Sequence, residues 1–155
     1  MTAEPDNAQV LVPPPVALAI AAIAALVADE LVPFPIASST VAFWAGAIIV
    51  AFALGLVIWA IATLHGSGSN VPTNRPTTTI VRTGPYAFSR NPIYLGSMLF
   101  LTGLSLADDN AWFLIALAPF ALVIRFGVIA REEAYLERKF EDVYSAYRSR
   151  VRRWL

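Results

Sequence analysis

The sequence contains no cysteine among its 155 residues. This absence excludes disulfide bonds, thiolate metal sites and a catalytic cysteine nucleophile, and it leaves the redox compartment open. Histidine is nearly as scarce, since His65 is the single example. A lone histidine at the end of an apolar run is more often a capping or surface residue than a catalyst.

Charge is also in short supply. Charged residues make up 14% of the chain and hydrophobic residues 57%, and the mean hydropathy is +0.63. An ordinary soluble domain of this length is more polar. The composition therefore predicts an integral membrane protein with several membrane-spanning segments.

Long apolar runs supply those segments, because a helix needs about 20 apolar residues to cross a bilayer. The sequence offers four candidate runs, of which the third is short: 16–32, 41–64, 93–107 and 112–129. The polar linker 108–110 is so brief that the third and fourth runs are expected to form a helical hairpin. We therefore expect an all-α membrane protein with about four transmembrane helices.

Lysine and arginine are absent from the first 74 residues. Three of the eleven basic residues lie in the loop 65–92 and eight lie between 125 and 153. The positive-inside rule places both basic segments in the cytoplasm, and an even number of spans then places both termini there. The N-terminus has no basic region before its first apolar run and carries Glu4 and Asp6 instead, so we expect no cleaved signal.

The chain shows no internal repeat and is expected to form a single domain, 1–155. Residues 1–15 are polar and then proline-rich, which is typical of a flexible lead-in. Two transmembrane helices follow in 16–64. The loop 65–92 is long for a compact domain, and a long loop with three arginines beside a membrane favours a functional role.

Beyond residue 129 the chain changes character. Glu133, Glu137 and Glu141 form a file of like charges, each pair costing about 0.2–0.5 kcal/mol on an isolated helix. The file is expected to attract cations from elsewhere. The opposite face is apolar, which predicts a C-terminal amphipathic helix lying at the membrane interface; its stripe is Leu136, Phe140, Val143, Tyr147 and Trp154.

The stretch "SRNPIYLG" marks the start of the third apolar run. Asn91 is expected to cap the free amides of a helix, and Pro92 suits the first helical turn, where its missing N–H costs nothing. Arg90 then stands beside a helix N-terminus that favours an anion. A lipid phosphate is the alternative partner of this arginine.

A second polar cluster, "REEAYL", follows the fourth run and contains Glu132 and Glu133. The helical hairpin would bring it to the same membrane face as Arg90. Together the two clusters supply an arginine, two carboxylates, free helix-start amides and tyrosines. A zwitterionic ligand with an aromatic part suits this set, in which the tyrosines are Tyr86, Tyr94 and Tyr135.

The segment "TGPYAFSRNPIYLG", followed further on by "REEAYLERKFEDVYSAYRSRVRRWL", resembles the isoprenylcysteine carboxyl methyltransferase and phospholipid methyltransferase family of integral membrane enzymes. That family binds S-adenosylmethionine through an Arg-His-Pro-x-Tyr motif and a Glu-Glu pair. The resemblance makes 65–155 the cofactor-binding part, with Arg90, Glu132 and Glu133 as catalytic candidates. It implies a cofactor site made of Gly84, Tyr86, Arg90, Asn91, Pro92, Tyr94, Gly96, Glu132, Glu133 and Tyr135.

Three positions depart from the family pattern. Asn91 replaces the histidine and can form hydrogen bonds but cannot titrate. Glu141 stands where a glycine often follows the phenylalanine. Val128 stands where prenylcysteine enzymes commonly carry an arginine, which makes a prenylcysteine carboxylate a less expected substrate.

The function implied is transfer of a methyl group from S-adenosylmethionine to a lipophilic acceptor, with S-adenosylhomocysteine as product. The acceptor could be an isoprenylcysteine-like carboxylate, a phospholipid amine or another small lipophilic molecule, and neither a metal nor a nucleic acid is expected to take part. One alternative is an NADPH-dependent membrane reductase of similar architecture, and another is a non-catalytic four-span protein. A transporter is disfavoured because the middles of the four runs carry no charge.

Overall fold

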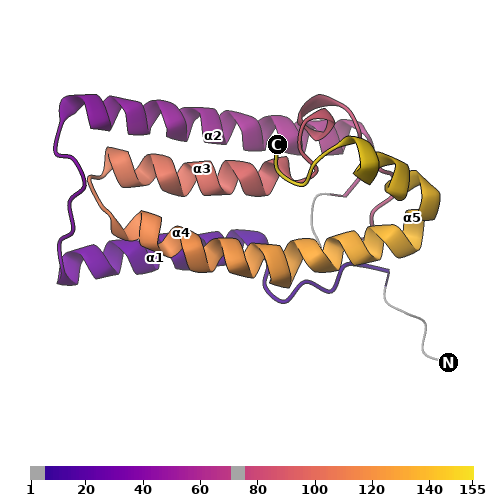
Figure 1. Ribbon diagram of the computed structural model, residues 1–155, viewed down its shortest axis with the longest axis horizontal. Coiled ribbons are helices and arrows are strands. Elements are labelled where there is room, and N and C mark those ends of the chain that lie inside the picture. The colour runs from indigo at the N-terminus through magenta and orange to yellow at the C-terminus, as the bar shows by residue number, and fades with distance from the viewer. Residues whose placement is uncertain (1–5, 71–75) are drawn as a thin grey trace.

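The computed structural model describes residues 6–70 and 76–155, so expectations for residues 1–5 and 71–75, including Glu4 and Arg75, lie outside it. All regular structure in the described residues is helical, which confirms the expected all-α class (Figure 1). The elements are α1 (Pro14–Leu31), α2 (Thr40–Gly66), the 3₁₀ turn η1 (Gly84–Ala87), α3 (Pro92–Ala107), α4 (Trp112–Leu122), the π-helical η2 (Val123–Ile129) and α5 (Ala130–Arg150).

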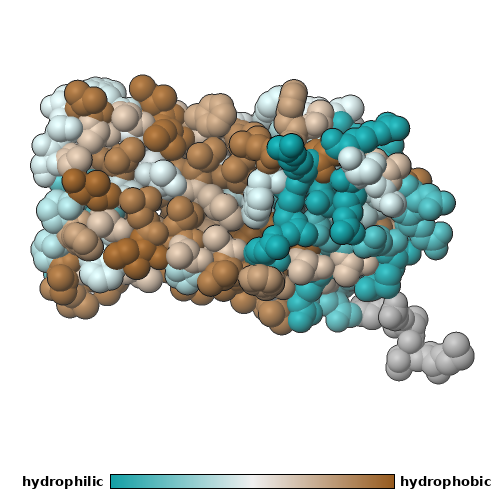
Figure 2. Space-filling view, in the orientation of Figure 1, coloured by the Kyte–Doolittle hydropathy of each residue, from teal (hydrophilic) through white to brown (hydrophobic). Residues whose placement is uncertain are grey.

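Within the described residues, three helical segments are long and apolar enough to cross a membrane: α1, α2 and the segment formed by α4, η2 and α5. The helix α3 is also apolar but has 16 residues. The first three expected runs match α1, α2 and α3 to within two residues at each end, whereas the fourth, 112–129, matches α4 and η2 and continues without a break into α5. Hydrophobic residues cover the length of the bundle, and hydrophilic ones gather at the end that holds α5 (Figure 2). The arrangement is that of a multi-pass membrane protein.

The helices pack in neighbouring pairs, with α2 along α3 and α1 along α4, and α3 and α4 form the expected hairpin. The closest approach is between α2 and α3. A Cβ atom added to Gly103 would lie 2.8 Å from the backbone nitrogen of Val50 and 2.9 Å from the carbonyl oxygen of Gly46. Small residues at such a contact let two membrane helices meet backbone to backbone.

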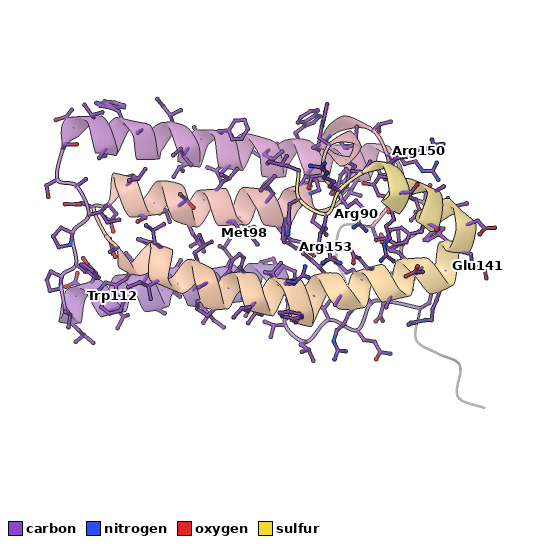
Figure 3. The ribbon with its side chains drawn as sticks, viewed as in Figure 1. Arg90, Met98, Trp112, Glu141, Arg150 and Arg153 are labelled. Atoms are coloured by element: carbon purple, nitrogen blue, oxygen red, sulfur yellow. The ribbon has the colours of Figure 1, made fainter. Side chains whose placement is uncertain are left out.

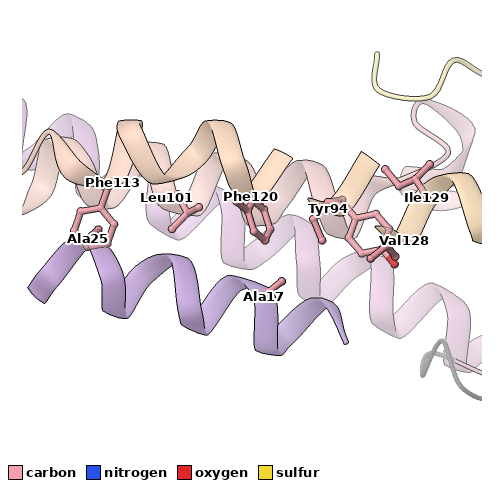
Figure 4. Packing of buried hydrophobic residues seen from close by; sticks show 9 residues of the cluster. Ala17, Ala25, Tyr94, Leu101, Phe113, Phe120, Val128 and Ile129 are labelled. Atoms are coloured by element: carbon pink, nitrogen blue, oxygen red, sulfur yellow. The ribbon is translucent and has the colours of Figure 1, made fainter. Parts of the chain in front are cut away.

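The apolar core lies between α1, α3, α4 and η2. Ala17 and Ala25 of α1 face Phe113 and Phe120 of α4 (Figure 4). Leu101 of α3 is completely buried in the same cluster. The outer faces of the helices are apolar as well, as expected for contact with lipid; exposed examples are Ile20, Phe52, Ile58 and Phe126.

The C-terminal helix α5 differs from the single amphipathic helix expected from the sequence. Glu141 has a non-helical backbone (φ 41°, ψ −116°), so α5 consists of two helical pieces joined by a bend. The second piece turns back over the polar end of the bundle (Figure 3). Val143, expected on the apolar face, is 49% exposed. Trp154 lies beyond the end of the helix and packs against the edge of the core.

Residues 6–13, which were expected to belong to a flexible lead-in, lie along η2 and α5. The backbone N–H of Leu11 donates a hydrogen bond to the carbonyl of Gly127 (3.1 Å). The carboxylate of Asp6 accepts hydrogen bonds from Lys139 Nζ (2.6 Å) and from the Tyr135 hydroxyl (2.8 Å). The start of the described chain is therefore attached to the same polar end as α5.

Candidate functional site

The first turn of α3 forms one wall of the site. The helix begins at Pro92 as predicted, but the predicted cap is wrong, because the side chain of Asn91 makes no capping hydrogen bond. Its Nδ2 instead donates to the carbonyl oxygen of Arg153 (3.1 Å), which also accepts a hydrogen bond from the Ser89 hydroxyl (3.2 Å). Asn91 therefore ties the start of α3 to the end of the chain and leaves the first-turn amides uncapped by its side chain.

Glu133 lies between two arginines. One carboxylate oxygen is 2.9 Å from Arg90 Nη1. Arg153 binds both carboxylate oxygens, because its Nε donates at 3.1 Å to the same Oε1 that Arg90 contacts and its Nη2 donates to Oε2. This hydrogen bonding raises the pKa of the Arg153 guanidinium. Glu137, one turn further along, pairs with Arg148 at 3.2 Å. The expectation that the glutamate file attracts cations is confirmed for these two carboxylates.

Glu132 has different surroundings. Its carboxylate accepts a hydrogen bond from the Tyr94 hydroxyl at 2.8 Å. No arginine or lysine among the described residues forms an ion pair with it, whereas its neighbour Glu133 has two such partners. The two adjacent glutamates therefore differ, and Glu132 is the one available to an incoming cation.

Aromatic side chains form much of the wall, because all five tyrosines of the chain line one cavity. The Tyr147 hydroxyl donates to the carbonyl oxygen of Tyr86 (2.8 Å), which joins α5 to η1. Burial raises the pKa of the Tyr86 phenol, and the nearby Glu132 carboxylate raises it further. This phenol therefore remains protonated and neutral at physiological pH.

The cavity itself has a volume of about 150 Å³ and lies where α2, the loop 76–83, α3 and α5 meet. Arg90 and Ser69 both line it. The Nε of Arg90 and the hydroxyl of Ser69 are buried and have no hydrogen-bond partner among the described residues. Leaving a buried polar group unpaired costs about 1–3 kcal/mol. Two such atoms in one cavity indicate a site for a polar ligand.

Eight of the ten predicted cofactor residues line this cavity: Tyr86, Arg90, Asn91, Pro92, Tyr94, Glu132, Glu133 and Tyr135. Gly84 and Gly96 lie outside the lining. A Cβ atom on Gly84 would meet the side chain of Thr63 at 2.8 Å, and one on Gly96 would meet Val57 at 2.6 Å. These two glycines allow close packing against α2. His65 is exposed at the end of α2 and is also outside the lining.

Several residues of the site were not identified from the sequence. Tyr144 and Tyr147 lie on the apolar face of α5. Their hydroxyl groups, which are polar on a mainly apolar face, were the only sign that they could belong to a site. Arg153 sits in a run of basic residues that resembles a lipid-binding tail. The long loop is expected from the sequence to have a functional role, but nothing in the sequence marks the loop residues that line the cavity, among them Ser69, Asn70, Thr77 and Thr79.

Comparison with known proteins identifies the family. A family model described as phospholipid methyltransferase matches residues 41–143, which include Arg90 and both glutamates. A protein of Haemophilus influenzae, described as uncharacterized, is 44% identical over 63 residues, which cover 41% of this chain and all of that protein. No solved structure matches the chain. Because the family model covers well over half of its length, this membrane protein belongs to the phospholipid methyltransferase family.

Proposed function

We propose that the protein transfers a methyl group from S-adenosylmethionine to a lipophilic acceptor that enters from the membrane. One observation carries the proposal. A single cavity is lined by Glu132, whose carboxylate forms no ion pair with a described arginine or lysine, and by Arg90, whose buried Nε has no hydrogen-bond partner among the described residues. A site that offers both a carboxylate and a cationic hydrogen-bond donor is complementary to a zwitterion. The methionine part of S-adenosylmethionine is a zwitterion.

The two charged groups have separate roles in this proposal. Glu132 would bind the ammonium group of the methionine part by a charge-assisted hydrogen bond. Arg90 Nε and the first amides of α3 would bind its carboxylate, at the positive end of the helix dipole. Glu133 is already neutralised by two arginines and would keep Arg90 in place.

The tyrosines would hold the remainder of the molecule. Tyr86 and Tyr94 lie beside the two charged groups and have their hydroxyls or backbone oxygens engaged with other residues. Their ring faces can cover the adenine or the sulfonium. A cation over such a face is stabilised by roughly 0.5–2 kcal/mol, depending on desolvation.

When bound, S-adenosylmethionine supplies a methyl group on a positively charged sulfur; the acceptor bonds to that carbon while the carbon–sulfur bond breaks and its electron pair stays on sulfur. The residues of this chain align the two reactants and exclude water. A carboxylate acceptor needs no base, whereas a protonated amine must first lose its proton. The cavity carboxylates Glu132 and Glu133 are the candidate bases for that proton.

The position of the cavity favours a membrane acceptor. It lies at the end of a bundle whose outer faces are hydrophobic (Figure 2). We propose that this end faces the cytoplasm, because the exposed arginines after residue 74 gather there and the positive-inside rule applies to them.

Calorimetric titration of the detergent-purified protein with S-adenosylhomocysteine tests the proposal. We expect wild-type protein to bind with a dissociation constant on the order of micromolar. Glu132→Gln should weaken binding at least about tenfold because it removes the charge that holds the ammonium. Glu137→Gln on the same helix is the matched control, since that carboxylate is exposed and paired with Arg148 outside the cavity.

Binding in wild type and its loss in Glu132→Gln would justify a search for the acceptor by labelled-methyl transfer into lipid extracts. Absence of binding by folded wild-type protein, or equal weakening in Glu137→Gln, would refute the proposed site. A parallel titration with NADPH should show no heat of binding, and a positive result there would favour a reductase.

A further inference from the structure

The last five residues, which we call the clasp (151–155), fold back onto the start of α3. The backbone N–H of Arg90 donates a hydrogen bond to the carbonyl of Arg152 at 3.0 Å. The carbonyl of Arg153 accepts hydrogen bonds from Ser89 Oγ and Asn91 Nδ2. Three consecutive residues of the α3 motif are thus bonded to two consecutive carbonyls of the clasp.

The side chain of Arg153 makes a separate contact. It reaches both oxygens of Glu133, and this carboxylate also binds Arg90. The side chains involved are largely buried, with 12% of Glu133 and 9% of Arg90 exposed. Trp154 packs against the core and anchors the clasp beside this contact. Figure 3 shows Arg90 and Arg153 side by side between α3 and α5.

The contact matters because of how the arginine donors are divided. A guanidinium can bind a carboxylate with two parallel hydrogen bonds. Arg153 binds both oxygens of Glu133 in this way, and Arg90 Nη1 shares Oε1 with Arg153 Nε while it also donates to the Tyr144 hydroxyl at 3.1 Å. The Nε of Arg90 has no hydrogen-bond partner among the described residues. Without Arg153, Glu133 would be free to take a second donor from Arg90.

We propose that Arg153 is a positioning residue of the cofactor site, which fixes Glu133 and through it leaves the Nε of Arg90 open to the ligand, while the clasp holds the start of α3 in place. The inference rests on the proposed function for the identity of that ligand. An ordinary exposed ion pair contributes little to stability and would have no such effect on a neighbouring site.

A double-mutant cycle with S-adenosylhomocysteine tests the positioning role. Arg153→Gln should weaken binding about tenfold. Arg153→Lys should recover only part of the lost affinity, because lysine restores the positive charge but not the two parallel hydrogen bonds of a guanidinium. Arg152→Gln is the matched control, since that side chain is exposed and only its carbonyl is used. If Arg153 acts through Glu133, the double variant Glu133→Gln/Arg153→Gln should bind no more weakly than Glu133→Gln alone.

Additive losses in the double variant, or equal weakening in Arg152→Gln, would overturn the proposal. A second measurement does not depend on the cofactor. The amide of Arg90 bonds to the clasp, so its hydrogen exchange in ligand-free protein should be about tenfold faster in Arg153→Gln than in Arg152→Gln.

The two measurements separate the possible failures. If wild-type protein binds no S-adenosylhomocysteine, the proposed function fails, and hydrogen exchange alone decides the clasp. Faster exchange in Arg153→Gln would then support the clasp, and equal exchange in the two variants would overturn it. If wild-type protein binds but neither affinity nor exchange responds to Arg153→Gln, the positioning role is overturned while the proposed function stands.

Discussion

Glu141 adopts a backbone conformation that suits glycine better than any residue with a side chain. Its φ of 41° lies on the left-handed side of conformational space, where a Cβ atom crowds the backbone. Such strain costs of order 1–3 kcal/mol. The family pattern that the sequence resembles often has glycine here, and the sharp bend in α5 is a physical reason for a glycine at this position.

Glu141→Gly should therefore stabilise the protein by about 1 kcal/mol, because glycine adopts this conformation without strain. Thermal unfolding in detergent measures the effect as a rise in the midpoint temperature. Glu141→Ala is the control, since it removes the carboxylate but keeps the Cβ atom. An equal gain in the alanine variant would mean that charge, and not the backbone, is responsible.

Asp109 holds the loop between α1 and α2 against the turn between α3 and α4. Its carboxylate accepts hydrogen bonds from the hydroxyl of Ser38 and from the backbone N–H groups of Ile36 (2.8 Å) and Ala37 (2.7 Å). These bonds, led by the one from Ser38, lower the pKa of Asp109 from its usual value near 3.8. The stabilisation is therefore complete above about pH 4 and is lost as the pH falls through the lower pKa of the folded state.

We expect Asp109→Asn to be less stable than wild type at pH 5 to 8, with the difference shrinking below about pH 4 as the wild-type carboxylate becomes protonated. Asparagine tolerates the positive φ of 50° at this position, so the substitution tests the charge and not the backbone. Midpoint temperatures measured across this pH range would decide the point. A difference that stays constant down to pH 2 would contradict it.

At the scale of secondary-structure elements, the contact between α2 and α3 sets the position of the site. Gly103→Ala should lower the midpoint of thermal unfolding clearly, because the added Cβ would meet the backbone of α2 below 3 Å. Gly55→Ala is the matched control on α2, where a Cβ meets nothing within 4 Å. That variant should be unchanged or stabilised by up to about 1 kcal/mol through the higher helix propensity of alanine. Equal tolerance of both changes would exclude a tight contact.

The helices themselves were largely predictable, because an apolar run of sufficient length is helical in a membrane whatever its neighbours are. The bend in α5 was not predictable from periodicity. The apolar pattern continues at helical spacing through the bend at Glu141 to Trp154. The single hint in the sequence was that Glu141 stands where the family pattern often has glycine. Tertiary contacts of the second half of α5 and of the clasp determine the bend.

At the scale of the whole molecule, the polar end of the bundle carries the site together with both described chain ends. The contact of Asp6 with Lys139 and the clasp on α3 place them there. The turn between α3 and α4 lies at the opposite end of the bundle (Figure 1). The molecule therefore presents two chemically different ends to the two sides of the membrane, as the distribution of arginine also predicts.

Topology can be measured directly, because the natural chain has no cysteine to react in the background. We expect Arg152→Cys to react with a membrane-impermeant maleimide only from the cytoplasmic side, and Asp108→Cys only from the other side. Both side chains are exposed, so access does not limit labelling. Inside-out and right-side-out vesicles compare the two variants. Labelling of both from one side would contradict the proposed orientation.

The sequence by itself determined the membrane class, the apolar helices and eight of the twenty residues that line the cavity, because each depends on a local run or on a short motif at a helix start. Only the tertiary structure decided which of two adjacent glutamates is open. Glu132 and Glu133 are neighbours on one helix and therefore point in directions about 100° apart. Arg153, brought back by the bend, pairs with Glu133, whereas Glu132 has no ion-pair partner among the described residues and accepts a hydrogen bond from Tyr94. That contact joins residues from distant parts of the fold, which no local pattern can specify.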